Sequence, residues 1–175
     1  RDGSLNPPPL NRFAEIAANQ ETALSFVVTN LEGPSFSSEL AHIILKLQAV
    51  QDRLIDEIVL AATAGGFRDV HFDFEFIPQE DREAYNAFLR KIKPRLTDNG
   101  LLLSTALAPK TSGEQMGLLY EAHDYPAHGE IVDFLVLMTY EWGYSAGPPL
   151  PVSPLNEVER VLEYAVSVIP PEKIL

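Results

Sequence analysis

Short apolar segments alternate with longer segments of helical periodicity along this chain. The short segments are rich in β-branched and aromatic residues, which is typical of buried strands, and they span 23–30, 70–76, 101–107 and 131–140. In the longer segments apolar residues recur every three or four positions, which predicts helices over 10–18, 37–63, 82–96 and 158–168. The second of these could be one helix or two with a break near Gln51.

This alternation predicts an α/β fold with parallel strands. The strands are apolar along their length, as in a sheet covered on both faces, and either a doubly wound sheet or a barrel satisfies the pattern. The chain has no GxGxxG or P-loop segment, which weighs against a nucleotide-binding fold. Residues 108–129 are predicted to be irregular, and 170–175 to lead into another strand.

The second predicted strand carries two carboxylic acids and an imidazole. Side chains alternate across a strand, so Phe72, Phe74 and Phe76 should share one face, and the other face should hold His71, Asp73 and Glu75. Burying such polar groups without partners costs several kcal/mol. A strand that served stability alone would place apolar residues there.

Asp73 and Glu75 are placed for acid–base chemistry. Their Cα atoms should lie about 7 Å apart, and two carboxyl groups at that spacing repel, so that one tends to keep a proton near neutral pH. A carboxylic acid that donates a proton needs this condition. Glu75 is closer to the carboxyl end of the strand, where parallel sheets and barrels place their active sites. The alternative is a structural acid pair in an unrelated α/β domain.

Two segments resemble glycoside hydrolase family 18. Residues 66–75, GFRDVHFDFE, resemble its signature strand DxxDxDxE, with Asp73 and Glu75 at the last two acidic positions. His71 stands in place of the middle Asp, and Arg68 in place of the first. The segment LMTYEWGY at 137–144, followed by Gly-Pro-Pro at 147–149, resembles the sixth-strand motif of the spore-cortex peptidoglycan branch, as do TNLEG and FSSELAH.

The resemblance implies a TIM barrel, of which this chain would hold the third to sixth of eight strands. Residues 1–175 are then expected to form a single, incomplete catalytic domain that lacks the first strands and the last two. The implied activity is hydrolysis of β-linked N-acetylglucosamine in peptidoglycan of the spore cortex, or in chitin-like glycans. In this family the acetamido oxygen of the substrate attacks the anomeric carbon, with retention. The alternative is a catalytically silent glycan-binding module of the same fold.

The resemblance also implies roles for individual residues. Glu75 would protonate the leaving oxygen and then activate water, Asp73 would hold the acetamido N–H, and Tyr140 would hydrogen-bond the acetamido oxygen. The residues expected to contact the substrate are His71, Asn30, Met138, Glu141 and Trp142. A histidine at position 71 can hydrogen-bond Asp73, and if charged it would lower the pKa of that carboxyl.

The composition of the chain limits the kinds of partner that we expect it to bind. The net charge of −12 over 175 residues argues against binding to a nucleic-acid backbone. The chain lacks cysteine, and it has no run of 18 apolar residues for a membrane span. We expect no cofactor and no metal, because His123, Asp124 and His128 match no helical ligand spacing and are predicted to be solvated loop residues.

The start of the chain and its strand count lead to two further expectations. The chain begins at Arg1 rather than Met and shows no signal peptide, so we expect it to be part of a longer protein. The resemblance implies that this protein acts at the bacterial spore or cell envelope. Open sheet edges in a partial barrel also predict self-association.

Overall fold

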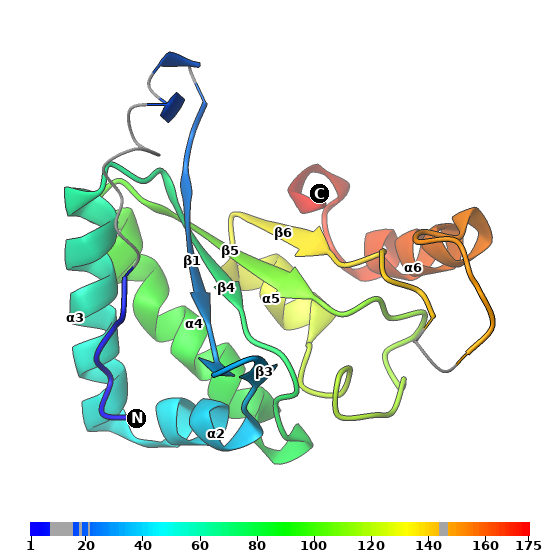
Figure 1. The fold of residues 1–175 in the computed structure, drawn as a ribbon, viewed down its shortest axis with the longest axis horizontal. Coiled ribbons are helices and arrows are strands. Elements are labelled where there is room, and N and C mark those ends of the chain that lie inside the picture. Colours follow the sequence, from blue (N-terminus) through cyan, green and yellow to red (C-terminus); the bar gives the residue numbers. More distant parts are fainter. Residues whose placement is uncertain (8–15, 18, 21, 144–146) are drawn as a thin grey trace.

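The structure is a computed structural model that describes residues 1–7, 16, 17, 19, 20, 22–143 and 147–175. Its centre is a four-stranded parallel sheet with strand order β1-β4-β5-β6 (Figure 1). The strands are β1 (Ser25–Thr29), β4 (Asp69–Asp73), β5 (Leu102–Leu107) and β6 (Phe134–Leu137). Each predicted strand is therefore present, and the parallel α/β fold is confirmed.

Helices follow the strands, as the alternating pattern predicts. They are α2 (Ser38–Lys46), α3 (Gln48–Ala64), α4 (Arg82–Thr97), α5 (Tyr125–Ile131) and α6 (Leu155–Val168). The predicted segment 37–63 forms two helices, which meet at Leu47 in an extended conformation rather than near Gln51. Ser37 caps α2, since its hydroxyl accepts a hydrogen bond from the Leu40 N–H at 3.1 Å. The small elements are β2 (Leu31–Glu32), β3 (Ser35–Phe36), η1 (Gln79–Asp81) and η2 (Pro171–Lys173).

The main hydrophobic core lies between the sheet and the helices behind it. Figure 1 shows α4 and α5 on the same side of the sheet. Phe72 of β4 points to this side and meets Phe74 and Phe88 edge-on, with ring centroids 5.4 Å apart in each pair. Val70 on β4 and Leu103 on β5 are register partners, and both are fully buried. This apolar layer helps to hold the strands in register with one another.

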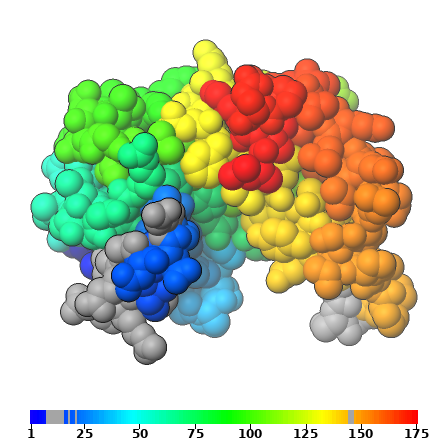
Figure 2. All heavy atoms as spheres, turned by 90° about the horizontal axis from the view of Figure 1, so that it is seen from above, coloured from blue at the N-terminus to red at the C-terminus, as the bar shows by residue number. Residues whose placement is uncertain are grey.

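The opposite side of the sheet is concave and partly open. Figure 2 shows this hollow between the blue N-terminal region and the orange segment after β6. Val27, which points to this side from β1, is 54% exposed. The expectation that both faces are covered is therefore met on one face only in the described part of the chain.

The region around β6 differs from the expectation. The strand covers Phe134–Leu137 only, because the predicted start near Ile131 is the last turn of α5. The prediction of irregular structure up to Gly129 is likewise wrong from Tyr125 onward. Asp124 begins α5, since its side chain accepts a hydrogen bond from the Ala127 N–H at 3.2 Å.

The chain after α6 returns to the sheet. Ile174 bridges Leu135 in parallel, the Leu175 N–H donates to the Leu135 carbonyl at 2.8 Å, and the Leu137 N–H donates to the Leu175 carbonyl at 3.0 Å. The prediction that 170–175 leads into another strand is thus confirmed. The helix predicted over 10–18 falls mostly outside the described residues.

Candidate active site

A cavity of about 540 Å³ opens at the carboxyl ends of β4 and β6. Its walls are Asp73, Glu75, Pro109, Leu119, Tyr120, Met138, Tyr140, Glu141, Trp142 and Gly143. Six of the eight predicted site residues are among them. His71 and Asn30 are the two that do not line the cavity.

Glu75 stands just beyond the end of β4, and Asn30 fixes its backbone. The Glu75 N–H donates to the Asn30 side-chain oxygen at 3.0 Å, and the Asn30 amide donates to the Glu75 carbonyl at 2.9 Å. Asn30 is fully buried and also donates to the Ser37 carbonyl at 3.1 Å. Asn30, predicted to contact the substrate, is thus placed to position Glu75 through its amide.

The backbone turns sharply after two of the candidate catalytic residues. Phe76, next to Glu75, has φ of 54°, and Glu141, next to Tyr140, has φ of 60°. Residues other than glycine rarely adopt this left-handed conformation, and such strain concentrates at functional sites. Phe76 is 38% exposed, so the prediction that it shares the buried face of Phe72 and Phe74 is wrong. The strand ends at Asp73, and the alternation ends with it.

The electrostatics of the cavity favour a protonated Glu75. Burial, then the neighbouring carboxylates of Asp73 and Glu141, raise the pKa of Glu75 to about 7. Burial also raises the pKa of Asp73. The pKa of Tyr140 is raised by burial and by the same acidic neighbours, so its hydroxyl stays protonated at neutral pH. The cavity therefore holds a carboxylic acid and a phenol that can both donate hydrogen bonds.

His71 lies on the open face of β4, beneath the cavity. Its Nδ1 is 2.7 Å from the Ser104 hydroxyl on β5. Burial lowers the pKa of His71, which keeps the ring neutral, although the charge of Asp73 acts in the opposite direction. At Asp73, burial raises the pKa and His71 acts in the opposite direction, so the two neighbours on β4 are electrostatically coupled.

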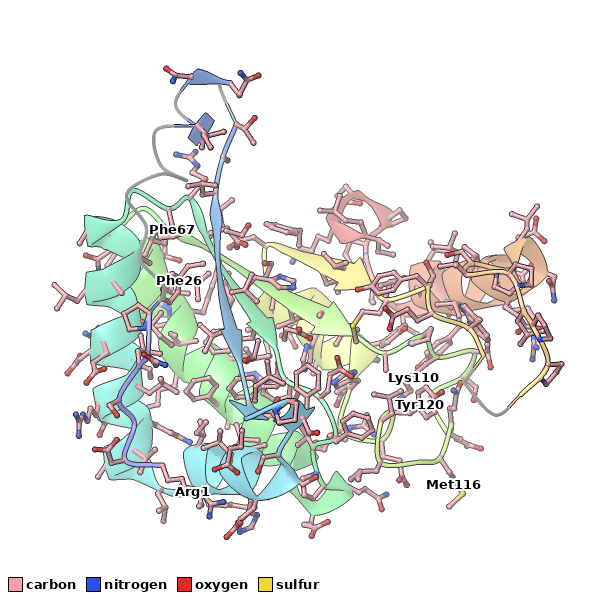
Figure 3. All side chains as sticks on the ribbon, in the orientation of Figure 1. Arg1, Phe26, Phe67, Lys110, Met116 and Tyr120 are labelled. Atoms are coloured by element: carbon pink, nitrogen blue, oxygen red, sulfur yellow. The ribbon has the colours of Figure 1, made fainter. Side chains whose placement is uncertain are left out.

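One wall of the cavity was not predicted from the sequence. Leu119 and Tyr120 come from the long connection after β5, which also contributes Pro109. Figure 3 labels Lys110, Met116 and Tyr120 in this connection, in which Met116 is 80% exposed. The sequence offered one signal for this wall, which is that the segment directly follows a strand. Segments that follow parallel strands gather at the end of the sheet where active sites lie.

The three residues predicted to be solvated in the loop after β5 are buried instead. His123 donates from Nε2 to the Phe74 carbonyl at 2.9 Å and accepts at Nδ1 from the Ala108 N–H at 2.7 Å, and burial lowers its pKa to about 4. Asp124 pairs with Arg82 at 2.9 Å, and His128 is fully buried. These side chains tie the segment after β5 to the core. In the described part of the chain, no group of three or more His, Cys, Asp or Glu residues is arranged to hold a metal ion.

The fold and the site together define a class of protein. Parallel strands with helices between them carry a proton-holding carboxylic acid and a second carboxyl group at their carboxyl ends, beside an open cavity. This is the arrangement of a glycosidase built on parallel strands. Among the described residues, no helix is long and apolar enough to cross a membrane.

The chain belongs to the glycosyl hydrolases of family 18, whose model matches residues 5–175. It is 55% identical over 175 residues to a cortical fragment-lytic enzyme of Bacillus subtilis (strain 168), covering all of this chain and 41% of that protein. It is 48% identical over 176 residues to the cortical fragment-lytic enzyme of Bacillus anthracis, with the same two shares. The predicted resemblance to the spore-cortex branch is thereby confirmed.

Two solved structures of similar proteins also match this chain. The spore cortex-lytic enzyme SleL of Bacillus megaterium QM B1551 matches with a TM-score of 0.94 and 53% identity, over 99% of this chain and 40% of that one. A chitinase of Chromobacterium violaceum ATCC 12472 matches with a TM-score of 0.91 and 25% identity, over 99% of this chain and 56% of that one. The chain spans about two fifths of the length of the curated relatives and of SleL.

Proposed function

We propose that the protein containing this chain hydrolyses β-linked N-acetylglucosamine in peptidoglycan fragments of the spore cortex. The observation that carries the proposal is Glu75, whose pKa is raised to about 7 inside a cavity that also holds Asp73 and Tyr140. A carboxylic acid that stays protonated near neutral pH can protonate a glycosidic oxygen. The names of the relatives, cortical fragment-lytic enzyme and spore cortex-lytic enzyme, support the choice of substrate.

The proposed reaction retains the anomeric configuration and uses the acetamido group of the substrate. Glu75 gives its proton to the leaving oxygen while the acetamido oxygen attacks the anomeric carbon. Asp73 accepts a hydrogen bond from the acetamido N–H and offsets the positive charge that develops there. Tyr140 donates a hydrogen bond to the acetamido oxygen. Glu75, now a carboxylate, then takes a proton from the water that opens the intermediate.

The remaining cavity residues are proposed to bind the sugars. Trp142 and Tyr120 both line the cavity, and each can offer an aromatic face to a sugar ring. Met138 follows β6 and also lines the cavity, and Glu141 carries an acidic side chain for sugar hydroxyls. His71 acts from beneath the cavity. We propose no cofactor and no metal for this chemistry.

We further propose that residues 1–175 are one domain and part of an eight-stranded barrel. The four parallel strands, the helices on one side and the hollow on the other support this (Figures 1 and 2). The spore or cell envelope is the proposed site of action of the whole protein. The relatives' names, which refer to the spore cortex, support this location.

The test is turnover by the full-length protein and by its Glu75→Gln variant. The substrate is a set of cortex fragments that contain N-acetylglucosamine, and the measured quantity is released reducing sugar. We expect a loss of at least about 100-fold in kcat, because a positioned acid contributes about 10²–10⁴-fold. Glu130→Gln is the matched control, since Glu130 is exposed and its one ion pair among the described residues is with Arg90 at 3.8 Å. Equal turnover by Glu75→Gln would exclude Glu75 as the acid.

A second candidate function is a catalytically silent glycan-binding module of the same fold. The observation that favours it is His71, which stands where the family signature has an aspartate. Calorimetry with N-acetylglucosamine oligomers separates the two candidates. Binding by the unmodified protein without any release of sugar would support the silent module.

A further inference from the structure

The peptide group between Phe74 and Glu75 lies beyond the hydrogen-bonded ladders of the sheet. β4 pairs with β1 up to Asp73, and its pairing with β5 ends one residue earlier. Two side chains hold this peptide instead. Asn30 accepts from the Glu75 N–H at 3.0 Å, and His123 donates from Nε2 to the Phe74 carbonyl at 2.9 Å. The peptide that leads into Glu75 is thus held at both of its polar groups.

These contacts determine the direction in which the Glu75 side chain points. A peptide group is planar, so hydrogen bonds to its N–H and to its C=O together fix the orientation of the plane before Glu75. The plane after Glu75 is held at the Glu75 carbonyl, which accepts from the Asn30 amide at 2.9 Å. The next carbonyl, that of Phe76, accepts from the Ser38 hydroxyl at 2.5 Å. Both backbone dihedrals of Glu75 are therefore constrained, and with them the bond that carries its carboxyl group into the cavity.

The two ring contacts of His123 fix the position of its hydrogen. The Ala108 N–H donates to Nδ1 at 2.7 Å, so Nδ1 carries no hydrogen. The Phe74 carbonyl can only accept, so the single hydrogen of the neutral ring is on Nε2. His123 is 1% exposed, and burial lowers its pKa to about 4, which keeps the ring neutral at neutral pH. The ring therefore donates to the Phe74 carbonyl in its ordinary state.

The backbone of His123 is tied to the wall of the cavity. Its N–H donates to the Tyr120 carbonyl at 3.1 Å, and Tyr120 lines the cavity. Its carbonyl accepts from Lys110 Nζ at 3.1 Å, and Lys110 is 1% exposed. One residue thus connects the peptide before Glu75 to the segment that forms a wall around the substrate.

We propose that His123 is a positioning residue, which holds the Phe74 carbonyl through Nε2–H and so aims the Glu75 carboxyl group at the glycosidic oxygen. This inference rests on the proposed function, because it assigns the acid role to Glu75. His123 itself transfers no proton and does not touch the substrate. A displacement of about 1 Å in a reacting group can cost about 100-fold in rate, so loss of this hydrogen bond should slow the step in which Glu75 gives up its proton.

Two amide substitutions separate the two ring contacts. In His123→Gln the amide nitrogen reaches about as far as Nε2 and can still donate to the Phe74 carbonyl. In His123→Asn the shorter amide lies near the position of Nδ1, where it can accept from the Ala108 N–H but cannot reach Phe74. His128→Asn is the matched control, because His128 is also fully buried in this segment and its Nδ1 lies 3.1 Å from the Thr105 hydroxyl instead.

The kinetic test is kcat/KM of the full-length protein on cortex fragments and on the 4-nitrophenyl glycoside of N-acetylglucosamine. A sugar leaving group needs the proton of the acid, whereas 4-nitrophenolate leaves without it. We expect His123→Asn to lower kcat/KM on the order of tenfold on cortex fragments, less than the about 10²–10⁴-fold that an acid itself contributes, and by less than about twofold on the aryl glycoside. His123→Gln and His128→Asn should stay within about twofold of the unmodified protein on both substrates.

Three results would overturn the proposal. Equal losses by His123→Asn on the two substrates would indicate a general loss of packing, which does not depend on the leaving group. A loss in His128→Asn as large as that in His123→Asn would show that any buried histidine of this segment has the same effect. A loss in His123→Gln would show that the contact with Ala108 is the important one, and this variant decides the question if His123→Asn does not fold.

Hydrogen exchange gives a second measurement that does not depend on turnover. Mass spectrometry of a fragment containing the Glu75 amide should show faster exchange in His123→Asn than in His123→Gln or the unmodified protein, with a fragment from β6 as the internal reference. The same exchange rate at Glu75 in all three proteins would contradict the role of His123. If the unmodified protein cleaves neither substrate, the proposed function fails, while the exchange rates still decide whether His123 holds the peptide before Glu75.

Discussion

The two faces of β4 carry different kinds of side chain. Val70 and Phe72 are fully buried against the helices, while Asp69, His71 and Asp73 on the other face carry ionisable groups. Because the side chains alternate, five consecutive residues serve both packing and proton chemistry. We therefore expect that substitutions only one residue apart on β4 can change stability and activity separately.

The largest expected effect is on the packed face. Phe72→Ala should lower the free energy of unfolding by about 3–5 kcal/mol, because it leaves a cavity between Phe74 and Phe88. Urea denaturation of the full-length protein measures this loss. Phe76→Ala is the matched control, since Phe76 is 38% exposed and should cost much less. Equal losses for the two variants would contradict the division of β4 into a packed and a polar face.

The polar side should determine how activity depends on pH. The proposed mechanism needs protonated Glu75, whose pKa is raised to about 7, so kcat/KM should fall as pH rises above 7, by about tenfold per pH unit. Glu141→Gln removes one of the charges that raise this pKa and should move the fall to lower pH. The measurement is kcat/KM on cortex fragments between pH 5 and 9. A flat profile across neutral pH would mean that another group supplies the proton.

The same carboxyl should have a smaller effect on stability, which also falls as pH rises. The folded state raises the pKa of Glu75 from 4.5 to about 7, so the protonated form is favoured in the fold and stability is lost as pH rises through this interval. Glu75→Gln cannot ionise and should abolish this contribution. We therefore expect the variant to gain melting temperature relative to the unmodified protein at pH 8 but not at pH 4. A constant difference between the two proteins at both pH values would argue against a shifted Glu75.

The sequence predicted the parts of the molecule that follow from local periodicity. The four strands, the helical segment after β1 and the return toward a further strand come from apolar spacing, and the strand ends locate Glu75 and Asp73. The local pattern could not predict contacts between residues that are far apart in the sequence, or where a strand ends. Asn30 and Glu75 meet across 45 positions of sequence through two hydrogen bonds. Phe76 departs from alternation because the strand ends three residues earlier.

The histidines illustrate the same limit. The spacing of His123 and His128 excludes a helical ligand pair, but it does not say whether the side chains are solvated. Both are buried because the segment after β5 folds back over α4 and uses them to satisfy the Phe74 carbonyl and the Thr105 hydroxyl. Similarly, the partnership of His71 with Ser104 depends on the register of β4 and β5, which a single sequence does not specify.

The smallest expected effect concerns the outer edge of the same sheet. β1 pairs with β4 on one side and has no strand on its other side among the described residues. Unpaired strand edges attract other strands, so residues 1–175 produced alone should self-associate. Val27→Lys places a charge beside this edge at a residue that is 54% exposed, so it should weaken association with little cost to folding. Light scattering across a concentration series measures the effect, and Leu60→Lys, at a 72% exposed position on α3, is the control. A monodisperse monomer with a cooperative melt would show that this edge is already protected, and that the two faces of β4 fold without further strands.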